Sequence, residues 1–166
     1  MKSMNCTKAI EIGVFTGSSA LVIAQGINDN GKLIAIDVDK KYTDIAKKMW
    51  KKAGVDHKIE LYLNGGIKKL EQLNKDKNEK ETYDFAYIDA IKTEYIDYYE
   101  KLLPLMKSGG ILAFDNVLRH GKVPDHNNTE EEIKYLRKFN EMIKNDERVE
   151  MCLITLADGV LFATKQ

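Results

Sequence analysis

Residues 8–21 read KAIEIGVFTGSSAL, and this stretch decides the fold. The apolar run 8–13 is typical of a buried strand, and the glycines that follow mark a turn before the apolar residues of a helix. Gly13 and Gly17 are spaced G-x-x-x-G, which differs from the G-x-G-x-x-G of dinucleotide-binding enzymes. The stretch predicts a strand, a turn and a helix. Gly13 either lets a ligand approach the backbone there or simply eases the turn.

The same alternation continues along the chain. Further strand-like runs cover 32–37, 58–63, 83–89 and 110–115, with helical patterns between them. One helical pattern stops at Gly54, a second is interrupted by Pro104, and a third opens with TEEE (129–132), which indicates a capping box. Strands that alternate with helices predict βαβ units, a parallel sheet and right-handed crossovers. The closing residues 149–165 hold two strand patterns around Asp158-Gly159, so we expect this α/β sheet to finish with an antiparallel hairpin.

Composition narrows the classes of protein. The chain has 166 residues, 43% of them hydrophobic, which predicts one globular domain over residues 1–166. Its 26 Lys and Arg residues balance 26 Asp and Glu residues, which argues against a strongly electrostatic nucleic-acid binder. No run of membrane-spanning length or secretory signal is evident, and Cys6 and Cys152 are too few for a disulfide framework. We therefore expect a reduced, cytoplasmic protein without membrane association.

Acidic residues mark the strand ends. In open α/β sheets, ligands bind beyond the carboxyl ends of the strands. Four acids lie in or at the end of predicted strands: Glu11, Asp37, Asp89 and Asp115. One acid at a strand end is usually a cap, but four at one edge repel unless a cation compensates them. Asp37 is placed to accept hydrogen bonds from both ribose hydroxyls of a nucleoside. That Asp89 and Asp115 merely cap the following segments remains the structural alternative.

A family resemblance joins these features. EIGVFTGSSAL (11–21), AIDVD (35–39), YIDAIK (87–92), GGILAFDNVL (109–118) and DGVLFATK (158–165) resemble the cation-dependent O-methyltransferases of the catechol and caffeoyl-CoA type. The resemblance runs from about Lys8 to Lys165. It implies a Rossmann-like class I methyltransferase fold, a three-layer αβα sandwich with strand order 3-2-1-4-5-7-6 and an antiparallel last strand. It also implies methyl transfer from S-adenosylmethionine to a hydroxyl of a catechol-like small molecule.

The resemblance assigns roles to residues of this sequence. Cofactor-binding residues would be Glu11, Gly13, Val14, Phe15, Ser19, Asp37, Gly66 and Asp89. Glu11 would hold the methionine end of the donor, Asp37 the ribose, and the turn at Gly66 would border the adenine. Asp89, Asp115 and Asn116 would hold a metal ion, and these oxygen donors suit Mg²⁺, Mn²⁺ or Ca²⁺. Lys92 would be the catalytic base, beside Asp89.

The sequence also departs from the family pattern. Family members carry helices before the first strand that cover the donor and contribute to dimer contacts. This sequence begins almost at the strand. Either the sequence is truncated or the pocket is unusually open. Without those helices we expect a wetter pocket, low activity and an apolar surface that favours association, with a homodimer allowed. Ile91 stands where many relatives have an acid, and Arg119 stands where a tryptophan is frequent near the acceptor, so the acceptor is left open.

Other functions compete with this reading. A non-catalytic domain that binds S-adenosylmethionine or another nucleotide is one, and a tRNA hydroxyuridine O-methyltransferase of the same family is another. A dehydrogenase is disfavoured by the glycine spacing. Zinc binding by His120 and His126 is a further alternative, although the loop RHGKVPDHNN (119–128) more simply borders the acceptor.

Overall fold

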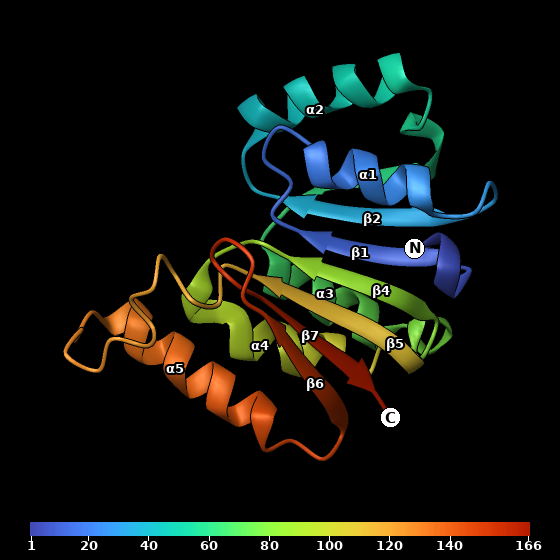
Figure 1. The fold of residues 1–166 in the computed structure, drawn as a ribbon. Coiled ribbons are helices and arrows are strands. Elements are labelled where there is room, and N and C mark those ends of the chain that lie inside the picture. Colours follow the sequence, from blue (N-terminus) through green and yellow to red (C-terminus); the bar gives the residue numbers. More distant parts are fainter.

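The structure is a computed structural model that describes residues 1–166. Its seven strands form one sheet in the order β3-β2-β1-β4-β5-β7-β6 (Figure 1). The strands are β1 (Lys8–Ile12), β2 (Lys32–Asp37), β3 (Ile59–Leu63), β4 (Tyr83–Ile88), β5 (Met106–Asp115), β6 (Val149–Ile154) and β7 (Val160–Lys165). Strands β1 to β5 pair in parallel, while β7 runs antiparallel to both β5 and β6. The predicted strand order and closing hairpin are confirmed.

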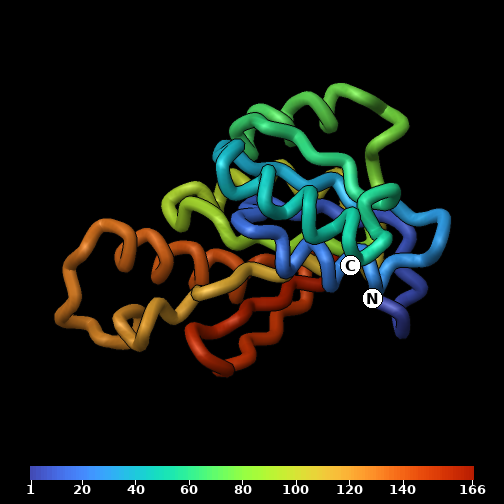
Figure 2. Tube along the Cα trace, turned by 90° about the horizontal axis from the view of Figure 1, so that it is seen from above, coloured from blue at the N-terminus to red at the C-terminus, as the bar shows by residue number.

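Helices cover the sheet on both faces, as predicted for a three-layer αβα sandwich (Figures 1 and 2). They are α1 (Ser18–Gly26), α2 (Lys40–Ala53), α3 (Gly66–Lys75), α4 (Tyr95–Leu102) and α5 (Glu131–Lys144). Short 3-10 helices are η1 (Lys2–Met4), η2 (Asp56–Lys58), η3 (Lys77–Glu79) and η4 (Lys92–Glu94). Helices α1 and α2 pack on one face, and α3, α4 and α5 pack on the other. No helix combines the length and the apolar character needed to cross a membrane.

Two apolar clusters hold these layers together, because side chains alternate across a strand. In β1, Ala9 faces the cluster under α1 and α2, whereas Ile10 and Ile12 face the larger cluster under the other three helices. The larger cluster has 27 buried residues and contains an aromatic group in which the rings of Phe114 and Phe139 lie 4.8 Å apart. The sheet is therefore covered most thickly on the side of α3, α4 and α5.

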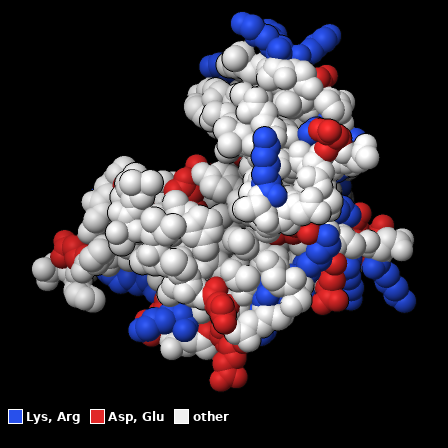
Figure 3. Space-filling view, turned by 45° about the vertical axis from the view of Figure 1, so that its right-hand side comes forward, with Lys and Arg blue, Asp and Glu red and all other residues white.

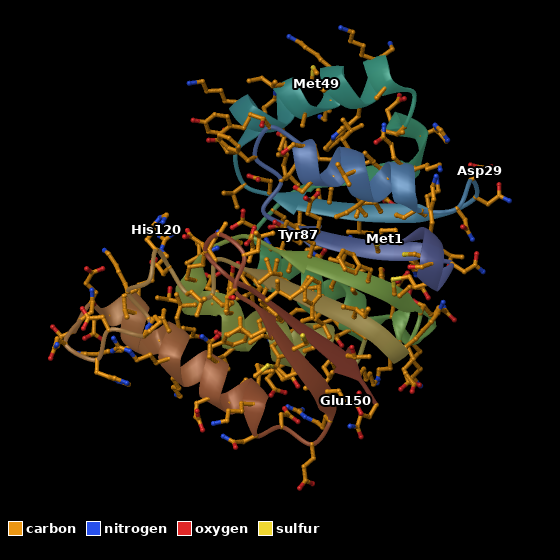
Figure 4. All side chains as sticks on the ribbon, viewed as in Figure 1. Met1, Asp29, Met49, Tyr87, His120 and Glu150 are labelled. Carbon is orange, nitrogen blue, oxygen red and sulfur yellow. The ribbon has the colours of Figure 1, made fainter.

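Helix α2 ends at Gly54 as predicted, and its start is capped. Asp39 caps its first turn by accepting a hydrogen bond from the Lys41 amide at 2.8 Å, and Gly54 ends it in the left-handed conformation. Trp50 is buried, but Met49 faces away from the sheet and is 48% exposed (Figure 4). Lysines gather over α2 at the outer end of the molecule (Figure 3), as expected for the solvated face of a helix.

Two element boundaries differ from expectation. The predicted capping box does not form, because α5 begins at Glu131 after Glu130, whose side chain makes no capping hydrogen bond. Glu130 instead accepts hydrogen bonds from Lys122 and Asn128 in the preceding loop. Strand β5 begins at Met106, four residues before the predicted start, once Pro104 has ended α4. Neither difference moves the sheet edge at which the parallel strands end, called here the carboxyl edge.

Candidate active site

A cavity of about 670 Å³ opens at the carboxyl edge, a size typical of small-molecule sites. It is lined by the segments that follow β1 to β5 and by the first turn of α5. Helix α5 and the loop before it project past this edge in both Figure 1 and Figure 2. The cavity therefore lies where a doubly wound sheet places its ligands.

The first turn follows from the two glycines in it. Gly13 has φ +93°, and a Cβ atom there would lie 2.0 Å from the carbonyl oxygen of Asp89. Gly17 has φ +83° and leaves room for Trp50, whose indole N–H donates to the Gly17 carbonyl at 2.9 Å. Only glycine allows both the backbone angles and these close approaches. The turn is thereby pressed against the end of β4, with Gly13 at the cavity wall.

Phe15 adds strain and an exposed ring to the same turn. Its φ is +50°, which is unfavourable for a residue with a side chain, and the ring is 58% exposed. The ring lies against Tyr42 with centroids 4.3 Å apart, and both residues line the cavity. The predicted cofactor-binding residues Gly13, Val14, Phe15 and Ser19 all line it. This aromatic pair, with the Phe15 side exposed, offers a surface on which a flat ligand ring could stack.

Asp37 has a structural role that the sequence did not reveal. Its Oδ2 accepts hydrogen bonds from the Val14 amide at 2.8 Å and the Phe15 amide at 2.9 Å, and its Oδ1 accepts one from the Asp39 amide at 2.7 Å. The carboxylate thus fixes the first turn to the end of β2. It also lines the cavity and, with about four acceptor positions, keeps capacity for a ligand.

Glu11 lies behind the cavity wall. Its carboxyl group is fully buried and does not line the cavity, but one oxygen accepts the hydroxyl of Ser19, which does. Its other oxygen, Oε2, has no hydrogen-bond partner. Burial, with the nearby charges of Asp37 and Asp89, raises the pKa of Glu11 from 4.5 to about 8, although the Ser19 hydrogen bond opposes the shift. A cationic group of a ligand bound nearby would interact favourably with this unpaired carboxyl group.

The raised pKa of Glu11 predicts a pH-dependent stability. Native protein holds the proton that unfolded chain loses, so this contribution is present below pH 4.5 and is lost as the pH rises through about 8. Glu11→Gln keeps an acceptor for Ser19 and cannot ionise. At pH 8 to 9 its free energy of unfolding should exceed that of the wild type by an amount on the order of a few kcal/mol. Near pH 5 the two proteins should be equally stable. Denaturant titrations from pH 5 to 9 test this, and parallel curves for the two proteins would contradict it.

Lys92 lines the cavity and is held in a polar cluster. It is 5% exposed, and its Nζ donates to Asp89 Oδ1 at 2.8 Å and to the Tyr95 hydroxyl at 2.7 Å. Tyr95 donates in turn to the carbonyl oxygen of Asp115 at 2.8 Å. Burial, together with the charges of Asp89 and Asp115, raises the pKa of Tyr95 well above its usual value. Tyr95 therefore connects the two predicted metal-binding strand ends, although the spacing of Tyr95, Tyr98, Tyr99 and Leu102 on one helical face is by itself typical of core residues.

The predicted metal ligands lie at one edge of the sheet, but they differ in their access to the cavity. Asp89 and Asn116 line the cavity, whereas Asp115 does not. Asp115 Oδ2 accepts the hydroxyl of Tyr87 at 2.6 Å, and Oδ1 accepts the Asn116 amide at 2.7 Å. Tyr87 lies in β4, near the centre of the sheet (Figure 4). The structure contains no group of three or more His, Cys, Asp or Glu side chains placed to hold a metal ion.

The oxygens of this set nevertheless fit a hard cation. Asp89 Oδ2 and the Asn116 side chain make no hydrogen bond within the protein, and each Asp115 oxygen takes only one. Two carboxylates and one amide, without sulfur, suit Mg²⁺ or Ca²⁺ better than zinc. His120, at the outer end of the site in Figure 4, pairs instead with Asp158 at 2.9 Å.

Comparisons with known proteins agree with this geometry. The sequence matches a family described as O-methyltransferase over residues 1–166. A probable caffeoyl-CoA O-methyltransferase 2 of Dictyostelium discoideum is 48% identical over 163 residues, which are 98% of this chain and 70% of that protein. An O-methyltransferase from Bacillus cereus, solved in complex with SAH, superposes with a TM-score of 0.90 at 26% identity over 99% of this chain and 76% of its own. TomG from Streptomyces achromogenes, solved with SAM, gives 0.91 at 25% identity over 99% of this chain and 75% of its own.

Proposed function

Since the chain belongs to the O-methyltransferase family, we propose that it transfers the methyl group of S-adenosylmethionine (SAM) to one hydroxyl of a vicinal diol on a catechol-like small molecule, with a divalent cation such as Mg²⁺. The observation that carries this proposal is the single cavity that joins three features. It has Asp37 at one end, Asp89 with Lys92 in the middle, and Asn116 with Arg119 at the other. A donor, a base and an acceptor can meet only in such an arrangement.

The donor half of the cavity fits a nucleoside. Asp37 would accept both ribose hydroxyls, and the turn that contains Gly66 would border the adenine. A side chain at Gly66 would lie 2.8 Å from Ile12, so glycine keeps this wall thin. The methionine end would lie along Gly13 and Ser19. Glu11 lies behind Ser19 with one oxygen unpaired, and a bound ammonium group would favour the ionised form of this carboxyl group. The SAH bound to the Bacillus cereus protein and the SAM bound to TomG support a donor of this class.

The acceptor half supplies the proton transfer. Lys92 would remove the proton of the attacking hydroxyl, and Asp89 and Tyr95 hold its amine in one position. Asp89, Asp115 and Asn116 would hold the cation, which when bound favours the ionised form of the hydroxyl and fixes the diol through both oxygens. A non-catalytic binder has no need of a buried lysine beside these oxygens. That contrast favours an enzyme over the binding-module alternative.

Donor binding through Asp37 gives the direct test of this site. Asp37→Asn keeps one oxygen for the Val14 and Phe15 amides but replaces Oδ1, which accepts the Asp39 amide, by an NH₂ group that can accept neither from that amide nor from ribose. We expect this variant to bind SAM at least about tenfold more weakly, a loss of about 1.4 kcal/mol. Titration calorimetry measures the change, and the unfolding midpoint shows whether the turn is intact. Asp44→Asn is the control, because Asp44 pairs with Lys40 outside the cavity. Unchanged affinity in Asp37→Asn would remove this residue from the donor site.

A further inference from the structure

The acceptor end of the cavity contains one cation with uncommitted donors. Only two basic side chains line the cavity, Lys92 and Arg119. Lys92 already donates to Asp89 and Tyr95 and is almost fully buried. Arg119 makes a single side-chain hydrogen bond, from Nε to Glu132 Oε1 at 2.6 Å. A guanidinium group has five N–H donors, so the four at its forked end remain available.

Arg119 reaches the cavity through a strained backbone conformation, which the neighbouring β6–β7 hairpin holds in place. Arg119 has φ +48° and His120 has φ +54°, two consecutive residues in the left-handed region. The turn between β6 and β7 holds them, since the Leu118 amide donates to the Asp158 carbonyl at 2.8 Å and the His120 amide to its carboxylate at 3.2 Å. Gly159 packs so closely on Leu118 that a Cβ atom would lie 2.6 Å from it. Strained backbone of this kind persists where the surroundings fix it, and it is concentrated at functional sites.

Glu132 sets the direction of the guanidinium group. It lies in the first turn of α5, lines the cavity and binds Arg119 through Nε alone. A carboxylate on Nε leaves the end of the fork, with its two NH₂ groups, free for a second planar or tetrahedral anion. Ile91, 60% exposed, also lines the cavity and adds apolar surface but no charge.

We propose that Arg119 determines acceptor specificity by binding an anionic group, a carboxylate or a phosphate, that the acceptor carries in addition to its diol. This inference rests on the proposed function, which it deepens by naming the charge class of the acceptor. The fork of Arg119 pairs with two oxygens of the anion, while Glu132 keeps the guanidinium in place. The acceptor is then held at both ends, by its anion at Arg119 and by its diol beside Asp89 and Lys92.

The competing explanation is that Arg119 and Glu132 only tie the loop to α5. Their side chains are 34% and 37% exposed, and an ion pair of that exposure contributes little to stability. A purely structural pair would affect every acceptor alike. The experiment must therefore compare acceptors that differ only in charge.

The test uses matched diols with tritium-labelled SAM and Mg²⁺. 3,4-Dihydroxybenzoate carries a carboxylate, its methyl ester is neutral, and 3,4-dihydroxyphenyl phosphate carries a phosphate. Arg119→Gln should raise KM for the charged diol at least about tenfold, and should leave kcat and the KM of the ester unchanged within about twofold. Lys122→Gln is the control, because Lys122 is a cation of the same loop that does not line the cavity. Lys122→Gln should change neither the KM of the charged diol nor the KM of the ester.

The outcomes separate the inference from the proposed function. A selective loss with the carboxylate or with the phosphate supports the inference and identifies the anion. An equal loss with acid and ester, or no loss, overturns it. If no diol is methylated, equilibrium binding of the charged diols to protein saturated with SAH and Mg²⁺ decides. Binding that Arg119→Gln weakens supports the anion site although the proposed function fails, and binding that the variant does not weaken overturns the inference as well.

Discussion

Lys92→Ala should lose about 10²- to 10⁴-fold in kcat, the range that general-base catalysis contributes. The donor end of the cavity is intact in this variant, so its affinity for SAM should stay within about twofold of the wild type. Lys92→Arg should not restore turnover, because arginine remains protonated and cannot accept a proton. Stopped assays over saturating donor and diol, with calorimetry for SAM, measure both quantities.

Removal of a buried lysine needs its own control. Lys69 is 7% exposed, lies on α3 with its amine 3.2 Å from the centre of the Tyr62 ring, and does not line the cavity. Lys69→Met should therefore keep kcat, whatever it does to stability. Normal turnover in Lys92→Arg would mean that Lys92 supplies only positive charge. Equal losses in Lys69→Met and Lys92→Ala would attribute both to the fold.

Removal of divalent cations should reduce methyl transfer about 10³-fold or more, because a bound cation stabilises developing charge by several kcal/mol. We expect EDTA followed by desalting to give inactive protein and added Mg²⁺ to restore it. SAM binding at Asp37 should be retained in the metal-free protein, since that end of the cavity uses no predicted metal ligand. Calorimetric titration of Mg²⁺ gives a measurement that does not depend on activity.

Variants at the predicted ligands sharpen the metal test. Asn116→Ala removes an amide that makes no hydrogen bond within the protein, so it should raise the Mg²⁺ concentration for half-activation. Because Asn116 has φ +58°, which asparagine tolerates better than alanine, a loss of stability of about 1 kcal/mol is expected as well. Asp115→Ala should do the same but also leave the Tyr87 hydroxyl without its partner, so some loss of stability is expected there. Full activity in EDTA would reduce Asp89 and Asp115 to caps of the segments that follow them.

Much of the fold could be predicted because local patterns determine it. The alternation of apolar runs with helical patterns gives a parallel sheet, and Asp158-Gly159 gives the hairpin that reverses β7. Gly13 and Gly17 could be recognised because only glycine adopts their backbone angles. The start of α5 was predicted wrongly because Glu130 bonds to Lys122 and Asn128 in the preceding loop, which local helix-capping rules do not include.

The site could be predicted as a set of residues but not as a network. Strand ends identified Asp37, Asp89 and Asp115, because parallel strands finish at one edge. The hydrogen bonds from the Val14 and Phe15 amides to Asp37 could not be predicted, because they depend on how the first turn folds back on β2. The complete burial of Glu11 depends on α1 and the neighbouring strands packing over it. Tyr95 looked like core, and only the three-dimensional position of Lys92 shows its polar role.

Methyl transfer itself is the most direct test of the central claim. Purified protein with Mg²⁺, tritium-labelled SAM and a neutral vicinal diol should place label on the diol and release SAH, and Lys92→Ala measured beside it should do neither at a comparable rate. Chromatography of the labelled product gives the answer without a coupled enzyme. A protein that binds SAM through Asp37 but passes label to no diol, charged or neutral, and releases no SAH would contradict the account.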